Sequence, residues 1–317
     1  MADGCLFPIA KIFDLCYYSS YKILLRQITR YDSKMDEKTV KELLDYGTER
    51  LSSHDISTAK LDAEILLAHA LNRDRTWLYI ESDKKVSNEI ESSYHALIGE
   101  RLSHIPIAHL VGHKEFMSLD FCVNASVLTP RPETEFLVEL VCNSQSDSNS
   151  ILELGTGSGA IAVSIAKYRP KCKILATDIS MDALVVARKN AINNGVLKSI
   201  YFIQTNLFDG ISSEAKFDWV VSNPPYITED DNLPDEVRKY EPSIALYGGK
   251  DGLDIIRQII GKAFRFLKKG GRLAIEIGYG QSEGVRKIAD EIGEYDSYEF
   301  IKDYANIPRI FYCSLKI

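Results

Sequence analysis

A short segment, Asn223-Pro224-Pro225-Tyr226, combines groups that can hold a planar nitrogen for methylation. An amide or aniline-like nitrogen is a poor nucleophile, because its lone pair is delocalised. Two acceptors directed at its two hydrogens would hold it and favour the more tetrahedral nitrogen of a transition state. Asn223 offers a side-chain oxygen, and Pro224 offers a backbone carbonyl whose direction the prolines restrict. Pro225 completes the turn, and the Tyr226 ring offers a face for a flat substrate group.

A glycine-rich segment has the composition of a cofactor-binding loop. Its members, which follow Ile151-Leu152-Glu153-Leu154, are Gly155, Thr156, Gly157, Ser158 and Gly159. Glycines permit a tight turn and a close approach of a ligand, and the N–H groups of a following helix favour a carboxylate. Asp178 ends the next predicted strand, where it can accept both hydroxyl hydrogens of a ribose. These residues alone leave a nicotinamide cofactor open, but the G-x-G-x-G spacing favours S-adenosyl-L-methionine.

Asn206 and Leu207 follow the third predicted strand. In a doubly wound sheet, this edge lies over the cofactor pocket. The Asn206 amide has the donor and the acceptor needed to meet an adenine edge. Asparagine is also favoured in turns for its local hydrogen bonds, so both interpretations stay open.

The segments that carry these residues alternate between strand and helix. Strands are predicted at 150–154, 173–177, 200–204, 217–222 and 272–277. Helices are predicted at 159–168, 181–193, 252–267 and 281–292. This alternation predicts a parallel sheet covered on both faces. Two further strands, 298–302 and 309–315, are joined by a short loop and must pair antiparallel. A doubly wound sheet ending in an antiparallel hairpin is typical of the class I S-adenosylmethionine-dependent methyltransferase fold.

The chain divides into four parts. Residues 1–34 are unlike the rest, and we expect them to be an extension without a role in chemistry, with translation starting at Met35. Residues 35–113 follow helical periodicity and predict a small all-helical domain, which either docks the substrate or serves as a scaffold. Residues 114–130 predict a hairpin linker. Residues 131–317 form the predicted methyltransferase domain.

Composition and charge exclude several classes of protein. The chain has 317 residues, of which 45% are hydrophobic and 26% charged, as in an ordinary globular protein. Its net charge of −7 argues against direct binding to nucleic acid, which needs a basic surface. No apolar run is long enough for a membrane helix. The six cysteines lack C-x-x-C pairs, which predicts free thiols in a reducing cytoplasm. The cluster His104, His109 and His113 lacks the partners of a zinc site, so we predict no metal.

Several motifs together resemble the HemK-like family of release factor glutamine methyltransferases, or protein-(glutamine-N5) methyltransferases. These motifs are ELGTGSG at 153–159, SNPPYI at 222–227 and LTPRPETE at 128–135, with further similarity at 241–254 and 303–309. The resemblance covers roughly residues 36–315. It implies methylation of the side-chain amide nitrogen of the glutamine in the Gly-Gly-Gln motif of peptide chain release factors, with S-adenosyl-L-methionine as cofactor. It also implies a helical N-terminal domain, a hairpin linker and a C-terminal catalytic domain.

The resemblance also implies roles for individual residues. The cofactor contacts carry over to Gly155–Gly159, Asp178, Asn206 and Leu207, with Asn223 adjoining them. Catalysis carries over to Asn223 and Pro224, and substrate binding to Asn223, Pro224, Pro225 and Tyr226. The chain departs from the family at Asn206, where many members have an acidic residue.

Two other functions fit part of the pattern. A methyltransferase acting on an exocyclic amine of a nucleic-acid base uses a similar motif, but base flipping needs a basic track and usually a target-recognition segment. A non-catalytic binding module with the same fold is disfavoured by the intact glycine loop together with Asn223.

Overall fold

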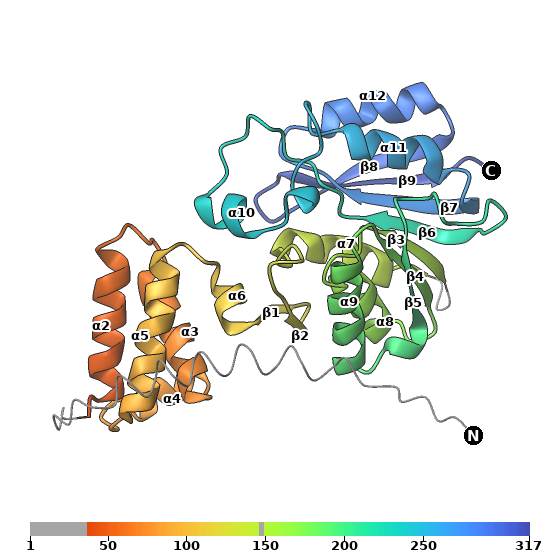
Figure 1. The fold of residues 1–317 in the computed structure, drawn as a ribbon. Helices are drawn as coiled ribbons and strands as arrows, with labels where there is room; N and C mark the ends of the chain where they lie inside the picture. The colour runs from red at the N-terminus through yellow and green to blue at the C-terminus, as the bar shows by residue number, and fades with distance from the viewer. Residues whose placement is uncertain (1–36, 146–148) are drawn as a thin grey trace, which may run out of the picture.

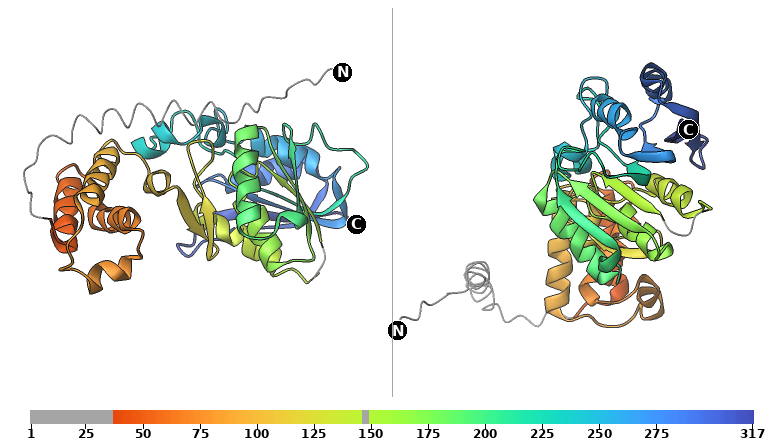
Figure 2. Two further views of the ribbon diagram at one scale, coloured as in Figure 1. Left: turned by 60° about the horizontal axis from the view of Figure 1, so that its bottom comes forward. Right: turned by 90° about the vertical axis from the view of Figure 1, so that its right-hand side faces the viewer.

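The molecule has two lobes joined by a short hairpin (Figure 1). The computed structural model describes residues 37–145 and 149–317, so the predicted extension at 1–34 and its start at Met35 lie outside the described residues. The first lobe is helical, and the second is built on a mixed sheet. Figure 2 shows the hairpin between them. Across these described ranges, no helix is both long enough and apolar enough to span a membrane.

The first lobe is a bundle of helices around one core. Its helices are α2 (Val40–Ser52), α3 (Ala59–Leu71), α4 (Arg75–Ile80), α5 (Asn88–Leu102) and α6 (Ile107–Val111). α2 begins in a capping box, in which Glu42 N–H donates to Thr39 Oγ1 and Thr39 N–H donates to the Glu42 carboxylate. Leu43, Leu66 and Tyr94 are fully buried in the core. The predicted helical character of this region is confirmed. The sequence did not predict the short helices α4 and α6 as separate elements, because one or two helical turns show too little apolar periodicity.

A buried asparagine attaches the hairpin to the second lobe. The elements involved are β1 (His113–Phe116), β2 (Leu119–Cys122) and α9 (Met181–Asn193). β1 and β2 pair antiparallel, which confirms the predicted hairpin. Asn190 of α9 accepts from the Cys122 N–H at 2.8 Å and donates to the Cys122 carbonyl at 2.9 Å. The same amide donates to the Ser158 carbonyl at 2.8 Å. One side chain therefore links the hairpin to the glycine loop.

Within the described residues, the second lobe has one seven-stranded sheet in the order β5-β4-β3-β6-β7-β9-β8. Its strands are β3 (Ser150–Leu154), β4 (Lys173–Asp178), β5 (Ile200–Gln204), β6 (Phe217–Ser222), β7 (Leu267–Glu276), β8 (Tyr295–Lys302) and β9 (Pro308–Leu315). β3 to β7 pair in parallel, whereas β9 pairs antiparallel with both β7 and β8. This topology confirms the predicted class I methyltransferase fold. The chain reverses its direction of winding between β3 and β6, the point at which doubly wound sheets bind ligands.

Helices cover both faces of this sheet, as Figure 1 shows. α7 (Glu135–Cys142), α8 (Ala160–Tyr168) and α9 pack on one face, and α11 (Asp254–Ala263) and α12 (Ser282–Ile292) on the other. β3 contributes to both cores, with Ile151 on one side and Leu152 and Leu154 on the other. Burial on both faces explains why these strands are almost continuously apolar.

The largest errors in the predicted boundaries lie at the α11–β7 connection, and the strand predicted from 298 begins earlier, at Tyr295. The helix predicted at 252–267 spans only Asp254–Ala263, and the strand predicted from 272 begins at Leu267. Leu267 pairs with Phe217 in the sheet, and the ladder resumes at Arg272 after an irregularity. Gly270, with a φ of 68°, lies in this irregular stretch. The two-turn helix α10 (Asp235–Tyr240) was not predicted either.

Candidate active site

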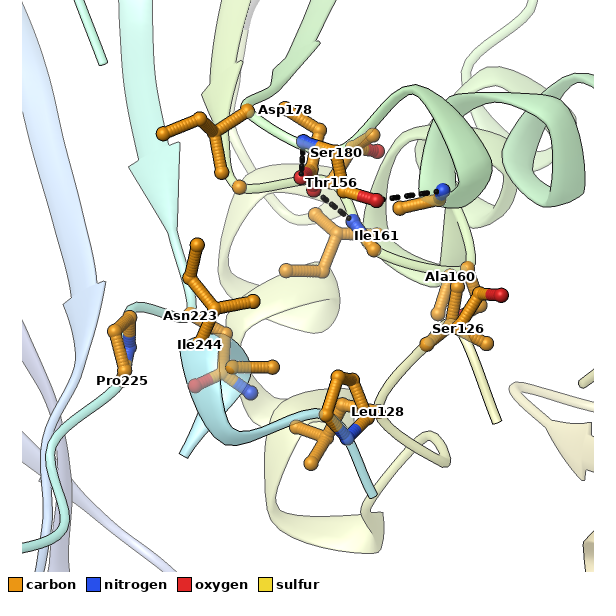
Figure 3. A pocket seen from close by; sticks show the side chains of 18 of the residues that line it. Ser126, Leu128, Thr156, Ala160, Ile161, Asp178, Ser180, Asn223, Pro225 and Ile244 are labelled. Atoms are coloured by element: carbon orange, nitrogen blue, oxygen red, sulfur yellow. Dashed lines mark hydrogen bonds between the residues drawn. The ribbon is translucent and has the colours of Figure 1, made fainter. Parts of the chain in front are cut away.

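A pocket at the carboxyl ends of β3, β4 and β6 brings together most of the predicted site residues. Its volume is about 250 Å³. The predicted residues that line it are Gly155, Thr156, Gly157, Ser158, Asp178, Asn206, Leu207, Asn223 and Pro225. Gly159, Pro224 and Tyr226 are not among the lining residues. Figure 3 shows Asp178 and Asn223 on different sides of the pocket.

The glycine loop leaves open space beside its backbone. Gly155 and Gly157 have φ angles of 69° and 54°, in the left-handed region that favours glycine. A Cβ added at either position would meet no other protein atom within 4 Å. Gly159 differs, because a Cβ there would come 3.0 Å from the Ala187 Cβ. The structure therefore places Gly159 at the close contact between α8 and α9, and Gly155 and Gly157 at the pocket.

Asp178 is held at the pocket wall by backbone groups. It is the last residue of β4, and its carboxylate accepts from Gly157 N–H at 2.8 Å and from Ser180 N–H at 2.9 Å. Burial raises the pKa of Asp178, and these backbone hydrogen bonds oppose that rise. Each carboxylate oxygen can accept a further hydrogen bond. The side chain is thus anchored and retains capacity for the hydroxyl groups of a ligand.

Glu153 lies beneath the loop and is fully buried. Thr156 Oγ1 donates to Glu153 Oε2 at 2.8 Å, whereas Oε1 has no partner among the described residues. Burial raises the pKa of Glu153 to about 8, and the neighbouring charge of Asp178 acts in the same direction. This shift favours the protonated, neutral form of Glu153 beneath the pocket.

Asn206 and Leu207 form the pocket rim beyond β5. Asn206 is exposed, and its side chain makes no hydrogen bond within the described part of the chain. The turn is closed by backbone instead, since Asp209 N–H donates to the Asn206 carbonyl at 3.0 Å. Leu207 has a φ of 46° and packs beside the pocket. The Asn206 amide is thus available to a ligand or to water.

Asn223 is held in a chain of hydrogen bonds behind the pocket. Its Nδ2 donates to Thr134 Oγ1 at 3.0 Å, and Thr134 Oγ1 donates to Glu276 Oε2 at 2.6 Å. The Tyr226 hydroxyl donates to the other Glu276 oxygen at 3.2 Å. The Asn223 Oδ1 accepts no hydrogen bond from any described residue. The amide nitrogen is therefore engaged by the protein, and the amide oxygen is left for a ligand.

The backbone of the Asn223–Tyr226 turn packs closely against Gly248 and accepts a hydrogen bond from Gln281. A Cβ on Gly248 would lie 2.6 Å from the Pro225 carbonyl oxygen, so only glycine fits there. Gln281 Nε2 donates to the Tyr226 carbonyl at 2.8 Å. Neither contact uses the Pro224 carbonyl, which accepts no hydrogen bond within the ranges that the structure describes.

Sequence reasoning missed the side chains behind Asn223. Thr134 ends the 3₁₀ turn Pro132–Thr134, directly before α7, and its side chain was given no role. Glu276 stands at the end of a predicted strand, where it is the acidic residue in an otherwise apolar stretch. A carboxylate in a strand buried on both faces was the available signal, because such a group needs hydrogen-bond partners.

A larger groove, with a volume of about 1030 Å³, lies between the lobes. Arg101 of α5 spans the boundary, since it donates to Asp62 of α3 and to Glu236 of α10, each at 2.8 Å. Arg131 donates to Glu241 at 2.6 Å and lines both the groove and the pocket. The groove and the pocket therefore share a wall.

The pocket fits the cofactor that the sequence predicts. Asp178 can accept the hydroxyl hydrogens of a ribose, and the open backbone beside Gly155 and Gly157 admits a ligand without steric conflict. In the parts of the chain that are described, no group of three or more His, Cys, Asp or Glu residues could hold a metal ion. The donor set thus suits S-adenosyl-L-methionine, with a hydroxyl-binding carboxylate on one side and an amide oxygen on the other.

Two family models match the chain, one over each lobe. The PrmC N-terminal domain matches residues 42–112, and the Methyltransferase small domain matches residues 131–238. The "Release factor glutamine methyltransferase" of Rhodopirellula baltica is 40% identical over 280 residues, covering 86% of this chain and 95% of that protein. The protein of the same name from Moorella thermoacetica is 38% identical over 277 residues, covering 86% and 97%.

Two further matches cover a smaller part of one or both chains. The "Bifunctional methyltransferase" of Rickettsia conorii is 37% identical over 300 residues, which are 86% of this chain and 57% of that protein. Among solved structures, the hMettl16 catalytic domain in complex with MAT2A 3′UTR hairpin 6 superposes with a TM-score of 0.51. It is 14% identical, with 69% of this chain and 81% of that chain covered, and it shows the fold alone.

Sequence identity of 38–40% across both lobes decides the family. The methyltransferase domain and the pocket geometry agree with it, and the cofactor is S-adenosyl-L-methionine. The chain is a methyltransferase and belongs to the release factor glutamine methyltransferase family.

Proposed function

We propose that this enzyme methylates the side-chain amide nitrogen of the glutamine in the Gly-Gly-Gln motif of peptide chain release factors. Family membership supports release factors as the substrate class. The choice of an amide nitrogen as the methyl acceptor rests on one observation. Asn223 is held by its own nitrogen on Thr134 at 3.0 Å, which leaves its oxygen to accept a hydrogen from the substrate.

Asn223 and Pro224 act as the two acceptors for the glutamine NH₂ group. As that nitrogen becomes tetrahedral and positively charged, its N–H groups become stronger donors, and the two hydrogen bonds strengthen with them. S-adenosyl-L-methionine supplies an electrophilic methyl group on its sulfonium. The site needs no strong base, because the methylated nitrogen loses its extra proton readily. Pro225 and Tyr226 bind the flat amide group from the same turn.

The opposite side of the pocket holds the cofactor. The backbone of Gly155–Ser158 lies beside it, and Asp178 accepts the hydroxyl hydrogens of its ribose. Asn206 and Leu207 contact its adenine end. Asn223 adjoins both ligands, since it lines the pocket from the substrate side.

The helical lobe supplies binding energy remote from the reacting glutamine. We assign it to residues 35–113, the linker to 114–130 and the catalytic domain to 131–317. The groove between the lobes shares the Arg131 wall with the pocket, so a release factor seated in it can reach Asn223. We also propose that the enzyme acts in the cytoplasm, where reducing conditions keep thiols free. The described cysteines, Cys122, Cys142, Cys172 and Cys313, are unpaired.

A methyl-transfer assay tests this function. Purified enzyme is incubated with isotopically labelled S-adenosyl-L-methionine and a purified release factor, and the labelled residue is located by mass spectrometry. The expected product carries one methyl group on the glutamine of the Gly-Gly-Gln motif. A release factor with that glutamine replaced by glutamate is the matched control and should take up no label.

Nucleic acids provide the competing outcome. DNA and ribosomal RNA are offered under the same conditions, because an exocyclic base amine also presents two hydrogens on a planar nitrogen. Label on a base in place of the release factor would overturn the proposal. The net charge of −7 favours the protein substrate.

A further inference from the structure

We infer that Thr134 and Glu276 are positioning residues that decide which way round the Asn223 amide stands, and thereby make the site selective for a nitrogen that donates two hydrogens. The inference rests on the proposed function. The three side chains form one chain of hydrogen bonds, from Asn223 Nδ2 to Thr134 Oγ1 at 3.0 Å and from Thr134 Oγ1 to Glu276 Oε2 at 2.6 Å. They come from three separate segments, at the end of β6, before α7 and at the end of β7.

The direction of these two hydrogen bonds follows from the number of hydrogens that each side chain can donate. An ionised carboxylate only accepts, and a hydroxyl has a single hydrogen to donate. While Glu276 is ionised, Thr134 therefore donates to it and offers only a lone pair to Asn223. A lone pair attracts the NH₂ end of the amide and repels its oxygen. Asn223 is consequently fixed with Oδ1 directed away from Thr134.

The opposite orientation would disable the site. If the Asn223 amide were turned over, its NH₂ group would face the NH₂ group of the substrate glutamine, and a donor would meet a donor. An unpaired polar contact of this kind in a buried site is unfavourable, because neither donor finds an acceptor. The Pro224 carbonyl alone would then hold the substrate nitrogen, and the second acceptor of the transition state would be lost.

Burial keeps water from replacing these partners. Thr134 is 4% exposed and Glu276 is 1% exposed. The Tyr226 hydroxyl donates to the second Glu276 oxygen at 3.2 Å, so both carboxylate oxygens are engaged. Burial raises the pKa of Glu276 to about 7 and the charge of Glu133 adds to the rise, while Thr134, Tyr226 and Arg309 lower it. Below that pH, protonated Glu276 can itself donate to Thr134, and the constraint on the amide is lifted.

Two substitutions at Thr134 test the inference. Thr134→Val keeps the shape of the side chain and removes the hydroxyl, whereas Thr134→Ser keeps the hydroxyl. We expect Thr134→Val to lower kcat about 10- to 100-fold, the size of effect that misplacing one reacting group produces. S-adenosyl-L-methionine affinity, measured by calorimetry, should stay within about twofold of the parent, and Thr134→Ser should recover most of kcat. A valine variant as fast as the parent overturns the inference, and so does a serine variant as slow as valine.

Glu276→Gln provides the second test, because a glutamine side chain both donates and accepts and no longer dictates what Thr134 does. In the parent, kcat should fall as the pH is lowered from about 8 to about 6, since protonation of Glu276 releases the amide. Glu276→Gln should show a lower kcat with a flat profile over that range. Retention of the parental kcat and profile by Glu276→Gln contradicts the inference.

Nuclear magnetic resonance separates this inference from the proposed function. The Asn223 side-chain amide of the nitrogen-15-labelled protein is identified by the signal that Asn223→Ala lacks. We expect its N–H toward Thr134 to be protected from exchange with water in the parent and in Thr134→Ser, and unprotected in Thr134→Val. Equal protection in parent and valine variant overturns the inference. A protected amide in an enzyme that methylates no release factor supports the orientation and overturns the proposed function.

Discussion

On the cofactor side of the pocket, Thr156 donates to the buried Glu153 at 2.8 Å, and on the substrate side Thr134 donates to the buried Glu276 at 2.6 Å. The cofactor-side partners are 3 residues apart in the sequence, whereas the substrate-side partners are 142 residues apart. Glu153 leaves one oxygen without a partner among the described residues. Glu276 has both oxygens engaged, and its network continues to Asn223.

The same pair of residue types therefore does two different things. The local pair stabilises the shape of a loop, and the ligand meets the backbone above it. The long-range pair orients a side chain that meets the reacting nitrogen. Substitutions on the substrate side should change the rate, and substitutions on the cofactor side should change affinity or stability.

Asn223→Ala should have the largest effect of the substitutions considered. It removes the side-chain oxygen that accepts from the substrate nitrogen, and loss of one such contact to a transition state lowers kcat about 100- to 1000-fold. S-adenosyl-L-methionine affinity should change by less than about 1 kcal/mol, because the other pocket residues stay in place. Initial rates on a release factor and calorimetry measure the two quantities.

Asn223→Asp is the matched control for that prediction. It retains an oxygen acceptor at the same position, so it should keep more activity than alanine, whatever its negative charge does to the sulfonium cofactor. An alanine variant with the parental kcat would contradict the proposed difference between the two sides of the pocket. The Asn223 side chain would then contribute no acceptor to the reaction.

Asp178→Ala should weaken S-adenosyl-L-methionine binding by about 1–3 kcal/mol, because a buried donor–acceptor contact is lost. kcat at saturating cofactor should change far less than in Asn223→Ala. Asp178→Asn keeps one oxygen and should fall between the parent and alanine. Unchanged affinity in calorimetry would remove Asp178 from the cofactor site.

Glu153→Gln should change the pH dependence of stability and leave the rate nearly unaffected. The folded protein keeps the Glu153 proton up to about pH 8, whereas the unfolded chain loses it near the ordinary value of 4.5. Stability from this proton is complete below pH 4.5 and is lost as the pH rises to about 8. The parent's free energy of unfolding should thus fall more steeply than that of Glu153→Gln, by roughly 1.4 kcal/mol per pH unit.

Urea denaturation between about pH 5 and about pH 8 measures this slope. Glu229→Gln, at an exposed loop position, is the matched control and should keep the parental slope. Parallel curves for the parent and Glu153→Gln would show that Glu153 is ionised when folded.

Asn206→Ala should have the smallest effect. Its amide is exposed and can hydrogen-bond water when no ligand is bound, so its removal should weaken S-adenosyl-L-methionine binding by less than about 1 kcal/mol. Asn206→Asp, with the acidic residue found in many family members, tests whether the acceptor matters more than the donor. A loss of affinity as large as that of Asp178→Ala would show that the pocket rim contributes as much to cofactor binding as Asp178 does.

The alternation of strands and helices, the antiparallel end of the sheet and the glycine loop followed by Asp178 could all be predicted from the sequence. All of these are encoded by neighbours in the chain. Apolar periodicity reports which face a strand buries, and Gly155 and Gly157 report a backbone conformation that other residues avoid. The glycine loop and Asp178 were predictable for this reason, since they lie within about 25 residues of each other.

The side chains that hold Asn223 in its orientation could be identified only in the folded structure. Thr134 and Glu276 are 89 and 53 residues away from it in the sequence, and no periodicity relates a helix start to the ends of two strands. Burial requires each of these polar groups to find a partner, but it does not say which one. That choice depends on the order of β6 and β7 in the sheet and on the path of the chain before α7. Packing brings the three side chains within hydrogen-bonding distance, and the single hydrogen of Thr134 then sets the direction of the amide.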